Sequence, residues 1–201
     1  GHDFYLWTYD NPTIPHTEGL VIKDAAEIIP REEVFSYRNK NKFGHGKGSY
    51  AGFSDIFRYK LLYEFGGWWV DMDVTCLKTF NFKMPYVFRA HHELDVVGNV
   101  MKCPKGAKAM LDSYKEALLE VDDENTDWHK PIEILNKHIK LNNLTKYVVE
   151  DMSYEDDWRV ISKLIKSNKI AINEDYYFIH WLNEEWRARR LSKEIIRYKS
   201  Q

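Results

Sequence analysis

The chain has 201 residues, a formal net charge of −2 and 44% hydrophobic residues. This length fits one domain with a substantial core, and the near-zero charge excludes the strongly basic class of nucleic-acid-binding proteins. No apolar run reaches the roughly 18 residues of a membrane span, and the first residues lack the pattern of a signal peptide.

Cys76 and Cys103 are too few for a disulfide framework and favour a reducing, cytoplasmic location. We expect residues 1–201 to form a single domain. Because a strand-like segment begins almost at residue 1, we also expect this domain to be incomplete at its N-terminus.

Residues 3–50 predict two short strands and a loop. DFYLWTYD (3–10) and GLVIKDAAEIIP (19–30) read as strands because apolar and aromatic residues gather there between turn-forming residues. The glycines of NKFGHGKGSY (41–50) then predict a mobile loop.

Residues 49–66 predict the first helix. Ser49 is its expected N-cap and Gly66 its expected C-cap. Apolar residues recur between them at helical spacing, at Phe53, Ile56, Phe57, Leu61 and Phe65.

Residues 67–73 (GWWVDMD) predict a strand that follows this helix. Alternate side chains of a strand point to opposite faces, so we expect one apolar face and one face with two carboxylates. The apolar face holds Trp68, Val70 and Met72, and the other holds Trp69, Asp71 and Asp73.

The rest of the chain predicts an alternation of strands and helices, which indicates an α/β sandwich. Strands are expected at 86–90 and 94–103, and helices at 106–121, at 131–139 and from Trp186 onward.

Asp71 and Asp73 offer two hard oxygen ligands for Mg²⁺ or Mn²⁺. An Asp-X-Asp pair alone is also common in solvated turns. Asp55 and Arg58 lie three residues apart on one face of the first helix, where a surface ion pair is the alternative to a functional contact.

The full string FSDIFRYKLLYEFGGWWVDMDV (53–74) joins that pair, a glycine turn and the two aspartates. It resembles the Ser-Asp-x-x-Arg-Tyr…Gly-Gly-x-Tyr-x-Asp-x-Asp pattern of the DXD sugar transferases, namely glycosyltransferase family 32, the polysaccharide-synthesis transferases and the large glucosylating toxins. The resemblance implies a GT-A-type fold, a Rossmann-like mixed sheet flanked by helices, without the first strand of its nucleotide-binding half. It also implies metal-dependent, configuration-retaining transfer of a sugar from a nucleotide diphosphate donor, a UDP-sugar, to a hydroxyl of a glycan or glycoconjugate.

The resemblance also assigns roles to individual residues. FIHWLNEEW (178–186) is similar to the closing His-x-x-Asn-x-x-Trp segment of the family, and the asparagine of the sugar pocket falls on Asn99. The implied metal ligands for Mn²⁺ or Mg²⁺ are Asp71, Asp73 and His180; the implied catalytic residues are Asp71, Asp73 and Asn99; the implied donor contacts are Asp55, Arg58, Trp69, Asn183 and Trp186.

Alternatives remain open at this level. His180 could be a core histidine beside Tyr177 and Trp181, and the chain could be a non-catalytic glycan- or nucleotide-binding module or a metal-dependent phosphohydrolase. A zinc site in HHELD (91–95) is improbable, because adjacent histidines on a strand point apart.

The tail WRARRLSKEIIRYKSQ (186–201) is basic, with Glu194 as its one acidic residue. A helix here would gather Leu191, Ile195 and Tyr198 on one side, flanked by Arg187, Arg190, Lys193 and Arg197. Packing of this stripe on the domain is favoured, and peripheral contact with an anionic inner membrane surface is the alternative; a docked helix could still present its basic residues to a membrane.

Overall fold

The computed structural model describes residues 3–42, 44–166 and 172–191. Its strands are β1 (Phe4–Thr8), β2 (Leu20–Asp24), β3 (Gly67–Val70), β4 (Val74–Cys76), β5 (Val87–His91), β6 (Asp95–Cys103), β7 (Val148–Val149) and β8 (Phe178–His180). Its α-helices are α1 (Ala51–Phe65), α2 (Lys108–Glu120), α3 (Lys130–Leu141), α4 (Trp158–Lys166) and α5 (Asn183–Ala188). Three 3₁₀ turns add η1 (Ala25–Glu27), η2 (Arg31–Glu33) and η3 (Thr145–Tyr147).

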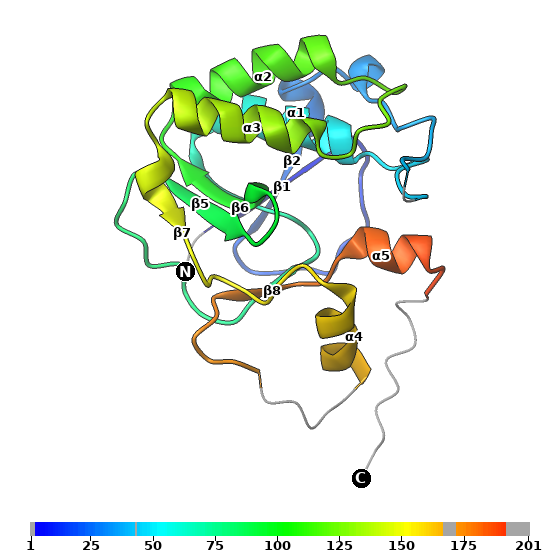
Figure 1. Ribbon diagram of the computed structural model, residues 1–201. Coiled ribbons are helices and arrows are strands. Elements are labelled where there is room, and N and C mark those ends of the chain that lie inside the picture. Colours follow the sequence, from blue (N-terminus) through cyan, green and yellow to red (C-terminus); the bar gives the residue numbers. More distant parts are fainter. Residues whose placement is uncertain (1–2, 43, 167–171, 192–201) are drawn as a thin grey trace.

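A four-stranded mixed sheet in the order β3-β6-β5-β7 forms the centre, with β7 parallel to β5 and the other pairs antiparallel. Helices α1, α2 and α3 lie on one side of it, whereas β8, α4 and α5 lie on the other (Figure 1). The predicted α/β architecture is therefore confirmed. A mixed sheet with flanking helices is compatible with a GT-A-like fold.

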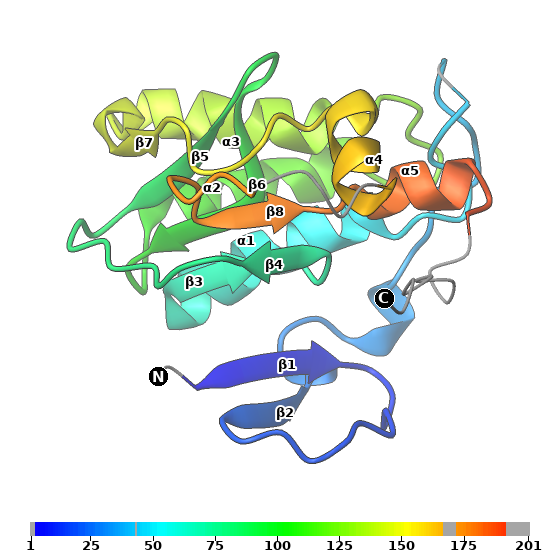
Figure 2. The same ribbon diagram turned by 90° about the horizontal axis from the view of Figure 1, so that it is seen from below.

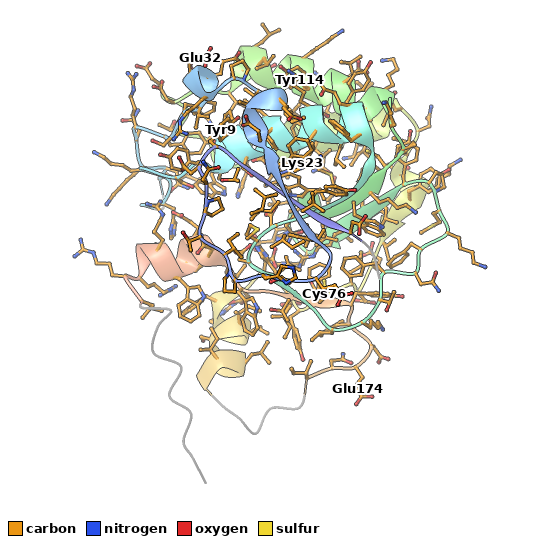
Figure 3. All side chains as sticks on the ribbon, turned by 180° about the vertical axis from the view of Figure 1, so that it is seen from behind. Tyr9, Lys23, Glu32, Cys76, Tyr114 and Glu174 are labelled. Atoms are coloured by element: carbon orange, nitrogen blue, oxygen red, sulfur yellow. The ribbon has the colours of Figure 1, made fainter. Side chains whose placement is uncertain are left out.

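Strands β1 and β2 form a separate parallel pair. Figure 2 shows this pair as a further layer beyond β3 and β4, and Figure 3, in which Tyr9 and Lys23 are labelled, shows it in front when the molecule is viewed from behind. The predicted strand at 19–30 is too long, because β2 ends at Asp24 and the Asp24 carboxylate accepts a hydrogen bond from Ala26 N that begins η1.

The first predicted helix is confirmed as α1, but its predicted N-cap is wrong. The N-cap position is Tyr50, and Ser49 Oγ accepts a hydrogen bond from Ala51 N at 3.3 Å. Gly66 is the C-cap as expected, and its positive φ of 69° is a conformation that glycine adopts without strain. The buried face of the helix contains apolar residues and also Asp55 and Arg58. These two residues therefore do not form a surface ion pair.

The strand predicted at 67–73 ends early, at Val70. Strand β3 pairs with β6, whereas β4 pairs with β8, so the chain changes sheets between Val70 and Val74. It does so in a turn in which Val74 N donates to Asp71 O at 3.2 Å and Met72 is 75% exposed. Asp71 and Asp73 thus belong to a turn between two strands, not to one strand.

The tail helix is the other correction. Helix α5 ends at Ala188, and residues 189–191 are not helical. Residues 192–201, with most of the predicted basic stripe, lie outside the described residues. Within the part of the chain that is described, no helix combines the length and apolar character needed to cross a membrane.

Helix α1 packs against Tyr37 at Gly52, and a substitution of this glycine tests how closely the two are packed. A Cβ there would lie 2.2 Å from the Tyr37 hydroxyl oxygen. Tyr37 cannot easily move away, because its ring is buried and packs on Trp128 and its backbone is hydrogen-bonded to Gly48 and Ser49. Gly52→Ala should therefore destabilise the protein by about 1–3 kcal/mol, although alanine is the better helix former by about 1 kcal/mol. Chemical denaturation measures the difference.

The control is the same substitution in a Tyr37→Leu background, where the ring that obstructs the methyl group is gone. There Gly52→Ala should cost clearly less. Equal costs in the two backgrounds would show that Tyr37 does not set the position of α1.

Candidate metal and donor site

The pairing of β4 with β8 brings two distant segments together (Figure 2). Val74 lies opposite His180 in this ladder, and Trp181 N donates to Asp73 O at 2.8 Å. The turn that carries the two aspartates therefore lies beside the end of β8. In the sequence only the family resemblance connects these segments, since local patterns predict neither β4 nor β8.

Asp71, Asp73 and His180 have the geometry of a metal site. One ligand atom of each lies within 4.8 Å of the others, and theirs is the one such group found among the described residues. Their side chains are 24%, 19% and 16% exposed, so a bound ion would be largely screened from water but still reachable. The two carboxylates are hard ligands of the kind that Mn²⁺ and Mg²⁺ prefer, and the imidazole is a ligand for transition metals, so the group could hold a divalent ion.

His180 lies between two carboxylates. Its Nε2 is 3.4 Å from Asp73 Oδ2, and its Nδ1 is 3.0 Å from Asp156 Oδ1. Burial opposes protonation of the ring, but the hydrogen bonds to Asp156 and Asp73 prevail and raise the pKa of His180 to about 9. The core-histidine alternative, in which aromatic rings surround His180, does not describe this polar setting.

The Asp73 carboxylate is also held by the backbone amide of Asn183. Its Oδ2 accepts a hydrogen bond from Asn183 N at 2.7 Å, at the start of α5. Burial alone would raise the pKa of Asp73, yet the contacts with His180 and this backbone amide lower it below its ordinary value. Asp73 therefore stays ionised, as a metal ligand must be.

Arg58 connects the helix to the aspartate turn. Its Nη2 lies 3.4 Å from Asp55 Oδ1 and 3.3 Å from Asp71 Oδ1, and both Asp55 and Arg58 are less than one-tenth exposed. Burial raises the pKa of Asp55 to about 6, although Arg58 opposes this. A buried cation beside two carboxylates balances charge that would otherwise be costly to remove from water.

Trp69 and Gly98 fix the positions of the Arg58 and Asp71 side chains relative to each other. Trp69 Nε1 donates to Asp71 Oδ1 at 2.5 Å, and the Arg58 guanidinium lies 5.1 Å from the Trp69 ring centroid. A Cβ on Gly98 would lie 2.8 Å from Arg58 Nη1, so the glycine lets the guanidinium lie against the backbone of β6. In this structure Trp69 holds Asp71, in addition to any contact it makes with a ligand.

The other three predicted site residues occupy neighbouring positions. Asn99 O accepts a hydrogen bond from Asp71 N at 2.8 Å, whereas its buried side-chain amide has no hydrogen-bond partner among the described residues. Asn183 reaches Asp73 through its backbone. Trp186 Nε1 donates to Trp181 O at 2.8 Å, and its ring packs edge-on against Trp158.

Asp156 is the residue that sequence reasoning missed. It precedes α4, a helix that was not predicted, and lies 24 residues before His180 in the sequence. The one local signal is the acidic pair at 156–157 before a helix, where Asp157 accepts a hydrogen bond from Arg159 N. Such pairs cap many helices, so the sequence offers no reason to connect Asp156 with His180.

The prediction that the adjacent histidines of HHELD (91–95) point apart is wrong. The rings of His91 and His92 do not point apart; they stack with centroids 4.3 Å apart, because β5 ends at His91 and a turn begins. His91 Nδ1 accepts hydrogen bonds from Glu93 N and Leu94 N.

The metal-free protein should lose stability as pH rises through the titration of His180. The pKa of His180 is higher in the folded protein than in the unfolded chain, so protonation of His180 stabilises the folded state. This stabilisation is complete below about pH 6.5, the pKa of a histidine in the unfolded chain, and is lost as the pH approaches about 9, the pKa in the folded protein. The free energy of unfolding should fall by an amount on the order of 2–3 kcal/mol across this window. Urea denaturation in the presence of a chelator measures it.

His180→Gln is the control, because glutamine keeps polar contacts but does not titrate. Its stability should change much less between these pH values. If the unaltered protein and the variant show the same pH dependence, His180 is not protonated between its two carboxylates.

In the comparison with known protein families, residues 6–90 match the family described as a glycosyltransferase sugar-binding region containing a DXD motif. This range includes α1 and both aspartates of the turn but ends before Asn99 and His180. No curated protein matches the chain, and no solved structure matches it. The match supports a glycosyltransferase-family domain with a DXD motif in this chain.

Proposed function

We propose that this protein is a metal-dependent glycosyltransferase that moves a sugar from a nucleoside diphosphate donor, a UDP-sugar, to a hydroxyl of a glycan or glycoconjugate. The observation that carries the proposal is the convergence of Asp71 and Asp73 with His180, from outside the matched family region. Burying two carboxylates beside a histidine more than a hundred residues away in the chain carries a desolvation cost that a purely structural turn could avoid with apolar residues.

Asp71, Asp73 and His180 would hold Mn²⁺ or Mg²⁺. When bound, the ion neutralises charge that develops on the departing diphosphate. The protein's own part is to keep the ligands fixed. The Asn183 amide holds Asp73, and Trp69 with Arg58 holds Asp71, so little reorganisation is needed when a donor arrives.

Arg58 and Asp55 are proposed to face the donor's ribose and phosphate groups. Arg58 is buried beside Asp71 and presents a fixed guanidinium, which suits the oxygens of a phosphate or hydroxyl. Asn99 adds an amide whose two polar atoms are buried without a partner among the described residues, and buried polar atoms of this kind call for a ligand or water. We propose that this amide contacts the transferred sugar.

Trp186 is proposed to lie near the leaving diphosphate, with Asn183 beside it at the start of α5. Because the Trp186 indole N–H already donates to Trp181 O, the contact would come from the ring, or from the N–H after α5 has moved. Retention of anomeric configuration is part of the proposal and rests on the family resemblance alone.

Manganese-dependent hydrolysis of a donor is the expected activity in the absence of acceptor. A panel of UDP-sugars should show release of UDP with Mn²⁺ and none with a chelator. Asp73→Asn should slow the reaction at least about a hundredfold, because it removes a charged ligand from the site. The folded state should persist, since asparagine can still accept the hydrogen bond from Asn183 N.

Glu174→Gln is the matched control: it removes an exposed carboxylate from the turn before β8 (Figure 3) and should leave hydrolysis unchanged. Mn²⁺-dependent binding of UDP without hydrolysis or transfer would favour the non-catalytic binding module. Release of phosphate from simple phosphate esters would favour a phosphohydrolase. Full activity of Asp73→Asn would contradict the proposal.

A further inference from the structure

We propose that Asp156, itself fixed by Arg89, is a positioning residue that orients His180 toward the metal. The inference rests on the proposed function, because it takes the site of Asp71, Asp73 and His180 to be a metal site. It adds to that site a residue that neither the family match nor the motif contains, since the match ends at residue 90.

Arg89 holds the Asp156 carboxylate from one side with two hydrogen bonds. Its Nη1 donates to Asp156 Oδ2 at 2.7 Å, and its Nη2 donates to Oδ1 at 2.9 Å. Arg89 lies on β5 in the central sheet and is 3% exposed, and its guanidinium is 5.4 Å from the Phe178 ring centroid. A bidentate pair in so enclosed a place leaves the carboxylate little freedom to rotate.

The N–H group of His91 also faces the Asp156 carboxylate. His91 Nδ1 accepts hydrogen bonds from Glu93 N and Leu94 N at 3.1 and 3.2 Å, so in the neutral ring the proton is on Nε2. That Nε2 lies 3.7 Å from Asp156 Oδ2. Arg89 and His91 both present N–H groups to Asp156, so the carboxylate acts purely as an acceptor.

The remaining contact of Asp156 determines which nitrogen of His180 is free. Because Asp156 Oδ1 is an acceptor, His180 Nδ1, 3.0 Å away, must be the protonated nitrogen in the neutral ring. The Nε2 lone pair then points to the side of Asp73, whose Oδ2 is 3.4 Å away. A hydrogen bond of this kind from the outer nitrogen of a metal-binding histidine fixes both its tautomer and its ring orientation.

Asp156 also connects α4 to the site. The residue lies just before Trp158, where α4 begins, and Arg89 Nη2 donates in addition to Tyr154 O at 3.1 Å. The segment 154–156 is thus held on β5, and the position of His180 depends on that attachment.

Manganese affinity is the first readout, measured by electron paramagnetic resonance of free Mn²⁺. Asp156→Asn keeps the size of the side chain and one acceptor oxygen but removes the charge and one acceptor for Arg89. It should weaken Mn²⁺ binding by about 10- to 100-fold. Arg89→Lys, which touches no proposed ligand, should weaken binding in the same direction. Asp157→Asn should leave it unchanged, because that neighbouring carboxylate pairs with Arg159 at the surface.

The tautomer of His180 is the second readout, and a purely structural role would not change it. In metal-free protein with ¹⁵N-labelled histidine, at a pH at which the His180 ring is neutral, two-bond ¹H–¹⁵N correlations should show Nδ1–H in the unaltered protein. This pattern should be lost or mixed in Asp156→Asn. The metal is left out because an ion on Nε2 would by itself keep the proton on Nδ1. If Asp156→Asn does not fold, Arg89→Lys is judged by the same two readouts.

Three outcomes are distinguishable. Weaker Mn²⁺ binding together with a changed His180 tautomer supports the inference. A folded Asp156 or Arg89 variant that binds Mn²⁺ as tightly as the unaltered protein, with Nδ1–H retained, overturns it while the proposed function stands. Failure of the unaltered protein to bind Mn²⁺ contradicts the proposed function, and the inference falls with it.

Discussion

The burial of negative charge is the constraint on which this structure depends. Asp71, Asp73 and Asp156 lie in one partly enclosed region, where each carboxylate needs a partner to remain ionised at acceptable cost. The partners come from different elements: Arg58 from α1, His180 from β8 and Arg89 from β5. Pairing charge in this way ties α1, the central sheet and the C-terminal segment to one place, so the elements that build the fold also build the site.

In the metal-free protein, the positive charge between Asp73 and Asp156 is that of protonated His180. Its Nδ1 faces Asp156 and its Nε2 faces Asp73, and these contacts raise the pKa of His180 to about 9 although burial opposes protonation. A divalent ion bound to Asp73 and to the Nε2 of His180 would replace the Nε2 proton with a stronger positive charge. Binding of the ion should therefore release a proton near neutral pH, and the affinity should increase with pH. The same groups thus stabilise the metal-free protein and, under the proposed function, would serve catalysis when the metal is bound.

Patterns within short stretches of the sequence predict the elements that depend on interactions between residues close together in the chain. Helix α1 follows from its apolar spacing and the Gly66 C-cap, and strands β3, β5 and β6 follow from their composition. The turn at Asp71 was read as strand because alternation continues through it, whereas the change of partner strand from β6 to β8 depends on long-range pairing. The motif was similarly informative for Asp71 and Asp73. Asp156 could not be found, since its role arises from Arg89 and His180, which are distant in the sequence.

The central claim is that Asp71, Asp73 and His180 together bind a divalent ion at the donor site. Crystals grown with Mn²⁺ and UDP test this most directly, through an anomalous difference map recorded at the manganese absorption edge. The account predicts a peak within bonding distance of Asp71, Asp73 and the Nε2 of His180, together with the diphosphate of UDP. A map with UDP bound but no peak there, or a peak from which His180 is absent, would contradict it.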